Sequence, residues 1–217
     1  MSLRKTSVLR GVSWGKDCNL LQIWALHPRT VTLGETTVIA LDKVDYHYGR
    51  AHLFSNLSLD LPQGSFHFLT GPSGAGKTTL LKLCYGELRA TQGDVTVLDT
   101  PVAPLDRDAV ALLRRRIGVV HQDCAFLDHL SIAENIALPL TVAGRDVDVQ
   151  DLMDLLSWVG LRSQADQLPQ SLSGGERQRA ALARAIITGP DVVIADEPTG
   201  NVDWEMSQRL LLLLIEL

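Results

Sequence analysis

Short apolar runs, most of them closed by glycine, proline or an acidic residue, give the sequence its most regular pattern. Runs of roughly four to eight such residues between turn-forming residues are typical of β-strands. The two runs Ile117–Val120 and Val192–Ala195 are almost wholly apolar, which indicates strands buried on both faces, as in a parallel sheet. The pattern predicts strands over Thr37–Val44, Leu57–Leu61, Ser65–Thr70, Asp94–Leu98, Ile117–Val120 and Val192–Ala195.

Segments of helical composition lie between and after these strands. Asp106 is placed to cap one of them, and Leu182, Ala185 and Ile186 form one apolar face of another. The predicted helices are Lys77–Tyr85, Asp106–Arg116, Ile132–Leu138, Gln150–Val159, Glu176–Ile187 and Trp204–Leu217, with Pro139, Gly144 and Gly160 separating the middle pieces. Strands that alternate with helices predict an α/β fold. The change in character over residues 123–170 predicts an inserted helical subdomain.

Length and charge narrow the class of protein. The 217 residues, 46% of them hydrophobic, suffice for one ordinary domain. A net charge of −5 argues against a general nucleic-acid surface, which needs clustered cations. The three cysteines and six histidines show no metal-binding or disulfide spacing. No apolar run approaches the roughly 18 residues that span a bilayer, so we expect any membrane association to go through a partner.

The first 36 residues have a different composition. Cationic residues precede the apolar run Leu20–Leu26, which faintly resembles a secretion signal, but Gln22 interrupts the run and no small-residue cleavage site follows. We therefore expect residues 1–36 to be either a disordered extension or a non-native one that results from a start codon placed too early. The folded domain is expected to span residues 37–217.

A phosphate-binding loop stands between a predicted strand and a predicted helix. Residues 71–78 read Gly-Pro-Ser-Gly-Ala-Gly-Lys-Thr, which matches G-x-x-x-x-G-K-[ST]. Its glycines let successive backbone N–H groups point at phosphate oxygens, and the helix that follows adds its positive end. Lys77 is expected to reach the β and γ phosphates, and the Thr78 hydroxyl to bind Mg²⁺. The alternative, a glycine turn without a ligand, is disfavoured by the flanking strand and helix.

An acidic pair closes the last predicted strand. Asp196 is expected to hold Mg²⁺, and Glu197 to orient and polarise the attacking water. Such a pair in isolation is more often the solvated start of a loop. Together with the phosphate-binding loop, it indicates nucleotide hydrolysis.

A third stretch, Leu172 to Glu176, reads Leu-Ser-Gly-Gly-Glu at the start of a predicted helix. Ser173 offers a hydroxyl, and Gly174 and Gly175 expose amides at the positive end of the helix dipole. Alone it would be a polar helix cap. With the other two motifs, it shows that the chain resembles the ABC ATPases from about Val38 to its last residue.

The resemblance implies the architecture and the cofactors. It implies a P-loop cassette with a mostly parallel core sheet, an antiparallel β subdomain and an inserted helical subdomain. In that family, ATP and Mg²⁺ bind at the phosphate loop, and the signature stretch of a second copy binds the γ phosphate. The expected assembly is therefore a homodimer that closes over ATP.

Further site residues follow from the resemblance. Tyr48 matches the aromatic residue that stacks on adenine, although simple packing would explain it equally well. Gln122 matches the glutamine that touches Mg²⁺ and the attacking water, and Asp203 lies in the loop that crosses the dimer interface. The implied nucleotide-binding set is Tyr48, Gly71, Pro72, Ser73, Gly74, Ala75, Gly76, Lys77, Thr78, Thr79, Gln122, Ser173, Gly174, Gly175 and Asp203. The implied catalytic residues are Glu197, Gln122 and Lys77, and the implied metal ligands are Thr78, Gln122 and Asp196.

The end of the sequence departs from the family pattern. Relatives have a further strand and a histidine that contacts the γ phosphate, whereas this sequence stops at Leu217. We therefore expect a C-terminally truncated domain, and an ATPase activity that is impaired in this chain. A nucleotide-gated binding subunit with little hydrolysis stays open as an alternative.

Within the family, residues 197–203 resemble the branch that powers membrane-remodelling and lipoprotein-release systems, and the segment Leu113–Asp123 resembles the ATPase that acts in bacterial cell division. That resemblance implies an FtsX-like membrane permease as the partner and a location on the cytoplasmic face of the inner membrane. The surface of residues 123–130 would receive a helix of the permease. Lipoprotein-release and macrolide-export ATPases are the alternative, and small-molecule importers look less similar.

Overall fold

The computed structural model of the chain describes residues 19–25, 36–49 and 51–198. Within them lie eight strands, five α-helices and two short 3-10 helices. The strands are β1 (Asn19–Ala25), β2 (Thr37–Tyr48), β3 (Ala51–Pro62), β4 (Phe66–Gly71), β5 (Gln92–Val97), β6 (Thr100–Pro101), β7 (Ile117–Val120) and β8 (Val192–Ala195). The helices are α1 (Lys77–Cys84), α2 (Arg107–Arg114), α3 (Ile132–Val142), α4 (Val149–Trp158) and α5 (Gly174–Ile186), with 3-10 helices at Arg162–Gln164 and Pro169–Ser171.

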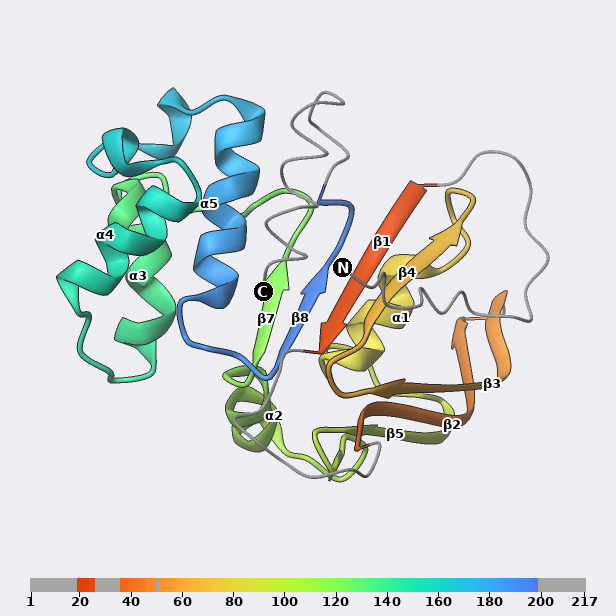
Figure 1. The fold of residues 1–217 in the computed structure, drawn as a ribbon. Helices are drawn as coiled ribbons and strands as arrows, with labels where there is room; N and C mark the ends of the chain where they lie inside the picture. Colours follow the sequence, from red (N-terminus) through yellow and green to blue (C-terminus); the bar gives the residue numbers. More distant parts are fainter. Residues whose placement is uncertain (1–18, 26–35, 50, 199–217) are drawn as a thin grey trace, which may run out of the picture.

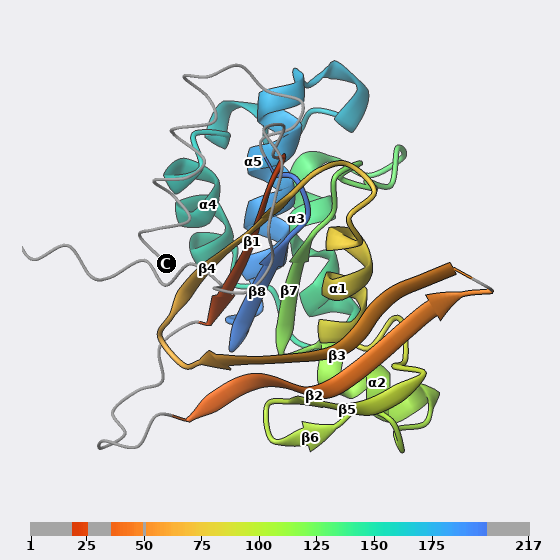
Figure 2. The same ribbon diagram turned by 90° about the vertical axis from the view of Figure 1, so that its right-hand side faces the viewer.

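The strands form two sheets, and the helices gather mainly at one end. The core sheet has the order β4-β1-β8-β7, and the second sheet, β3-β2-β5-β6, is antiparallel throughout. Helices α3, α4 and α5 form a group beside β7, while the antiparallel sheet lies at the opposite side of the core sheet (Figure 1, Figure 2). The predicted α/β class and its three parts are confirmed.

Three of the four core strands run in one direction. β7 pairs with β8 in parallel, and β1 pairs antiparallel with both β4 and β8, so β4, β7 and β8 share a direction. Strand β1 comes from the first 36 residues, which were expected to stay outside the domain. The structure instead places Asn19–Ala25 between β4 and β8. Its apolar run, considered above only as a signal segment, has the length of an ordinary strand.

Strand β8 is buried on both faces, as its sequence predicts, and its four residues are 0% exposed. Alternate residues point to opposite faces of a sheet. Val192 and Ile194 belong to the apolar cluster that contains the buried residues of α1 and β2, whereas Val193 and Ala195 belong to the cluster beneath α5. The buried strand therefore holds the two acidic residues that follow it, Asp196 and Glu197, in a fixed place.

Helix α3 differs from its prediction. Pro139 was expected to end it, yet the helix continues to Val142 with Pro139 inside. Proline lacks the N–H that would bond to the carbonyl of residue 135, which normally ends or kinks a helix. Ile132, Ile136 and Leu140 recur at helical spacing and are buried in the structure, so packing of this face offsets the missing hydrogen bond. None of the helices in the described ranges is long and apolar enough to cross a membrane.

Candidate functional site

The loop between β4 and α1 has the backbone shape that its glycines predict. Gly74 and Gly76 have φ values of 79° and 90°, in the left-handed region, where residues with a Cβ are strained. A Cβ on Gly76 would also approach the Leu53 side chain to 2.9 Å. Gly76 is the N-cap of α1, so the first N–H groups of the helix face the loop and are available to an anion.

The Lys77 side chain lies inside this loop and bonds to its backbone. Its Nζ donates to the backbone carbonyls of Gly71 and Pro72, at 3.0 Å each, and the residue is only 7% exposed. An ammonium group held by two carbonyls keeps a third N–H for another acceptor. The loop therefore presents one fixed positive charge beside the amides of the helix start.

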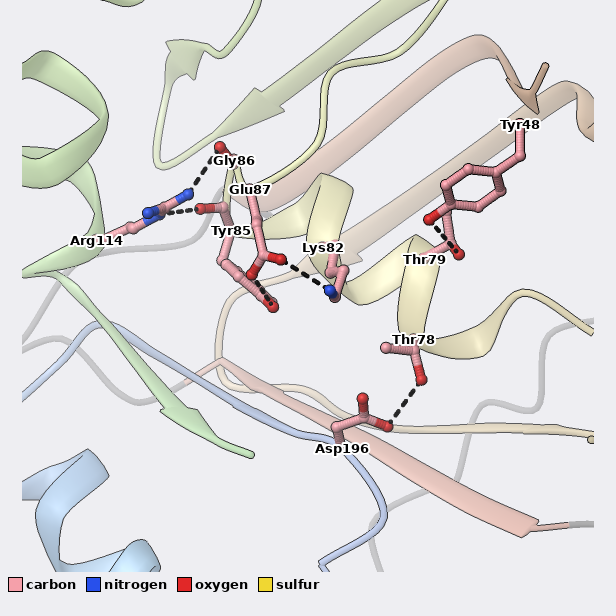
Figure 3. A network of polar contacts seen from close by, with 9 residues as sticks. All are labelled: Tyr48, Thr78, Thr79, Lys82, Tyr85, Gly86, Glu87, Arg114 and Asp196. Atoms are coloured by element: carbon pink, nitrogen blue, oxygen red, sulfur yellow. Dashed lines mark hydrogen bonds and ion pairs between the residues drawn. The ribbon is translucent and has the colours of Figure 1, made fainter. Parts of the chain in front are cut away.

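Thr78 and Asp196 meet across the site. The Thr78 hydroxyl donates to Oδ1 of Asp196 at 3.3 Å, which joins the start of α1 to the end of β8 (Figure 3). Burial raises the pKa of the Asp196 carboxyl, and the hydrogen bond from Thr78 acts in the opposite direction. A hydroxyl and a carboxylate are hard oxygen ligands of the kind that Mg²⁺ takes.

The donor set fits a Mg²⁺ ion that also binds phosphates. Among the described residues, no group of three or more histidine, cysteine or acidic side chains gathers as a metal site. Protein-bound Mg²⁺ commonly has one or two carboxylates, with phosphate oxygens and water completing six positions. Thr78 and Asp196 therefore suit a metal ion that arrives with a nucleotide.

Glu197 has an uncommon backbone conformation. Its φ is 47°, a left-handed value that a residue with a side chain adopts at a cost of roughly 1–3 kcal/mol. Conformations of this kind concentrate at functional sites, where the surrounding structure holds them. The left-handed backbone of Glu197 is therefore consistent with a functional role, as the acidic pair predicted.

Gln122 lies at the same edge of the sheet. Strands β7 and β8 pair in parallel with Val120 opposite Ala195, and the Asp196 N–H donates to the Val120 carbonyl at 2.9 Å. Both strands thus deliver their next residues to one place. Gln122, two residues beyond β7, has an exposed side chain.

Tyr48 stands at the end of β2, near the start of α1. The residue is 53% exposed, and its ring meets the Tyr46 ring edge to face, with the centroids 5.0 Å apart. Its hydroxyl oxygen is 3.5 Å from Oγ1 of Thr79 (Figure 3). Tyr48 is therefore an exposed residue beside the phosphate loop, and its stacking on adenine stays a prediction.

The signature residues begin α5. Ser173 caps the helix in a capping box: its hydroxyl accepts from the Glu176 N–H at 3.4 Å, and its own N–H donates to Oε2 of Glu176 at 2.8 Å. The Ser173 hydroxyl also donates to that Oε2, at 2.6 Å. These hydrogen bonds lower the pKa of Glu176, with the bond to the Ser173 hydroxyl contributing most. The helix-cap reading is thus correct for Ser173, and Gly174 and Gly175 place two further amides at the same helix end.

The signature is on another part of the fold from the phosphate loop. Helix α5 starts at the end of the core sheet where β7 and β8 finish, within the helical group (Figure 1). The hydrogen bonds of Ser173 stay within its own subdomain. A contact between this stretch and a bound phosphate remains a prediction about a second copy. Asp203 and the helix predicted over Trp204–Leu217 lie outside the described residues.

The structure also shows a polar network that the sequence did not suggest. Lys82 bonds to Glu87 at 2.8 Å, and Tyr85 donates to the same carboxylate at 2.8 Å (Figure 3). Arg114 donates to the backbone carbonyls of Tyr85 and Gly86, at 3.1 Å each. These bonds fix the C-terminal end of α1, whose N-terminal end carries Thr78. The Arg114 bonds join α1 to α2, and no sequence motif marks them.

Comparisons with known proteins find a family match and similar sequences. A family model described as ABC transporter matches residues 54–200. The cell division ATP-binding protein FtsE of Haemophilus influenzae is 44% identical over 165 residues, which are 75% of this chain and 75% of that protein. The methionine import ATP-binding protein MetN 2 of Paraburkholderia xenovorans is 42% identical over 162 residues, which are 74% of this chain and 42% of that protein.

A solved structure is similar over most of the chain. It is a dimeric, post-hydrolysis state of the ATP-binding cassette MJ0796 bound to ADP and Pi. It aligns with a TM-score of 0.72 and 29% identity, and it covers 81% of each chain.

Proposed function

The chain belongs to the ABC transporter family, and we propose that it is the ATP-binding and ATP-hydrolysing subunit of an FtsEX-like system acting in bacterial cell division. The observation that carries the ATPase proposal is the meeting of Thr78 with Asp196 beside the Lys77 loop. This arrangement joins the phosphate-binding motif to the acidic motif in one site. The name of the Haemophilus influenzae relative supports the role in division.

Each residue of the site has a part in hydrolysis. The loop amides and the Lys77 ammonium hold the phosphates of ATP, and the exposed ring of Tyr48 stacks on adenine. Thr78, Asp196 and Gln122 hold Mg²⁺, which neutralises charge on the phosphates. Glu197 accepts a proton from the attacking water, whose position Gln122 helps to fix. Positioning and electrostatics supply most of the catalysis.

A homodimer completes the site. Ser173, Gly174 and Gly175 of a second copy would cover the γ phosphate, with Asp203 near the interface. The solved relative MJ0796 is dimeric, which supports this assembly. Closing and opening of the dimer would move the helices of an FtsX-like permease at the cytoplasmic face of the inner membrane. Leu127, 41% exposed in the segment 123–130, gives that surface an apolar contact.

A second candidate is the cassette of a small-molecule importer. The methionine import relative is nearly as similar as the cell division relative, so importers are closer than the sequence motifs suggested. Copurification of the membrane partner separates these roles: an FtsX-like permease supports division, and an importer permease supports transport.

Steady-state hydrolysis of Mg²⁺-ATP, with Glu197→Gln as the comparison, tests the enzymatic proposal. The variant should lose roughly 10²–10⁴-fold in rate if Glu197 is the base, and it should still bind ATP. Equal hydrolysis by both proteins would exclude that role. Binding and dimerisation without hydrolysis by the unaltered protein would instead support a nucleotide-gated subunit.

A further inference from the structure

Helix α5 packs against β7 without side chains between them at one point. A Cβ on Gly118 would lie 2.2 Å from the backbone oxygen of Ala185, far inside the distance that real Cβ atoms keep. The helix and the strand therefore approach as closely as their backbones allow. The loop that leaves β7, residues 121–126, runs beside the same helix, since α5 side chains contact its carbonyls.

Gln178 is a polar side chain on the buried face of α5. It is 2% exposed and lies one helical turn before Leu182. Its Nε2 donates to the backbone carbonyl of Gln122 at 3.3 Å. Its Oε1 is buried and, among the described residues, has no hydrogen-bond partner. A buried acceptor of this kind costs roughly 1–3 kcal/mol, so stability alone does not explain a glutamine at this position.

Arg184 holds the same loop further along. Its guanidinium donates to the carbonyls of Cys124 and Ala125, the latter at 2.9 Å, and lies over the ring of Phe126, 4.6 Å from the centroid. Cys124 and Ala125 have φ values of 59° and 35°. Two consecutive residues with side chains in left-handed conformations need support from their surroundings. The α5 side chains supply it.

We propose that Gln178 and Arg184 are positioning residues that hold the loop of residues 121–126 by its carbonyls and so set Gln122 against the Mg²⁺ and water of the site. The inference rests on the proposed function, in which Gln122 has that contact. Helix α5 then has two roles: its first residues carry the signature, and its Gln178 and Arg184 side chains position the loop of residues 121–126. Because α5 starts at Ser173, one helix then links the nucleotide of the partner copy to Gln122 of its own copy.

The test is the affinity for a fluorescent ATP analogue, measured with and without Mg²⁺. Gln178→Met keeps the side-chain length and removes the donor together with the unpartnered oxygen. Without Mg²⁺ its affinity should match the unaltered chain within about twofold, because the phosphate loop is intact. With Mg²⁺ it should weaken by about two- to tenfold, the range expected for one lost hydrogen bond. Gln150→Met, the same change at an exposed position of α4, should alter neither value.

A double-mutant cycle separates positioning from a general structural role. Gln122→Ala should reduce the effect of Mg²⁺ on ATP affinity, and adding Gln178→Met to it should cause no further loss. Additive losses, or an unchanged effect of Mg²⁺ in Gln178→Met, would overturn the inference. If melting shows that Gln178→Met does not fold, Arg184→Lys replaces it in the same cycle and decides by the same criteria. Failure of the unaltered chain to bind ATP at all would overturn the proposed function, and the inference with it.

Discussion

The Thr78 hydroxyl donates to the Asp196 carboxylate across 3.3 Å, although 118 positions separate the two residues in the chain. This contact brings the N-terminal end of α1 to the C-terminal end of β8. In open α/β sheets, ligands bind at the carboxyl ends of the strands, and both residues reach that edge.

Replacing Asp196 with asparagine should stabilise the protein without nucleotide. Burial raises the pKa of the Asp196 carboxyl, so the folded state binds its proton more tightly than the unfolded state. Stability therefore falls as the pH rises through the folded pKa, and the ionised group is destabilising at pH 7. Asp196→Asn should melt at a higher temperature at pH 7, and the difference should shrink as the pH falls toward about 4.

Thermal melting of both proteins across that pH range is the measurement. Asparagine keeps an oxygen that accepts from Thr78, so the hydrogen bond is retained. A lower melting temperature for the variant at pH 7 would show that the carboxylate stabilises the empty site.

The capping box at Ser173 predicts that the stability of the protein falls at low pH. Its hydrogen bonds lower the pKa of Glu176, so the stability that the ionised carboxylate contributes is present above its unfolded pKa, about 4.3. It is lost as the pH falls through the lower folded value. Glu176→Ala should reduce the free energy of unfolding at pH 7 by about 0.3–1 kcal/mol, the contribution of a carboxylate near a helix N-terminus.

Glu176→Gln is the matched variant, because glutamine also accepts hydrogen bonds in a capping box. It should lose less stability than Glu176→Ala at pH 7. Denaturant titrations below pH 5 should also show a smaller acid loss for Glu176→Gln than for the unaltered chain. Equal acid sensitivity of Glu176→Gln and the unaltered chain would show that ionisation of Glu176 does not contribute to stability.

If Tyr48 stacks on adenine, ATP affinity should depend on the aromatic ring at this position. Stacking of a base on an aromatic side chain is worth about 1–3 kcal/mol, so Tyr48→Ala should weaken ATP binding by at least about fivefold. Tyr48→Phe keeps the ring and loses only the long contact with Thr79, and should bind nearly as well as the unaltered chain. Titration with a fluorescent ATP analogue measures both. Equal affinities for the alanine and phenylalanine variants would favour packing alone.

The sequence predicted the elements whose pattern is local. Strands β7 and β8 have the predicted limits, because each is a short apolar run buried on both faces. Asp106 caps α2 as predicted, accepting from the Ala109 N–H at 2.8 Å. The phosphate loop could be predicted because its turn needs left-handed backbone conformations, which glycine adopts without strain.

Features that depend on distant partners could not be predicted. Pro139 stays inside α3 because burial against other elements outweighs a local rule. Strand β1 is positioned by pairing with β4 and β8, which no property of its own residues reveals. Gln178 gave a weak signal, a polar residue on the apolar face of a helix, but its contact with Gln122 depends on how α5 meets β7.

The decisive measurement for the phosphate site is the ATP affinity of the unaltered chain and of Lys77→Ala. Lys77 is held by the Gly71 and Pro72 carbonyls in the phosphate loop, and a hydrogen bond to a charged group contributes about 1.5–3 kcal/mol. In the presence of Mg²⁺, the unaltered chain should bind ATP, and Lys77→Ala should bind at least about tenfold more weakly. Lys43→Ala, which removes an exposed lysine of β2, should bind as the unaltered chain does. Absence of ATP binding by the unaltered chain, or equal affinity after Lys77→Ala, would contradict the assignment of the phosphate site.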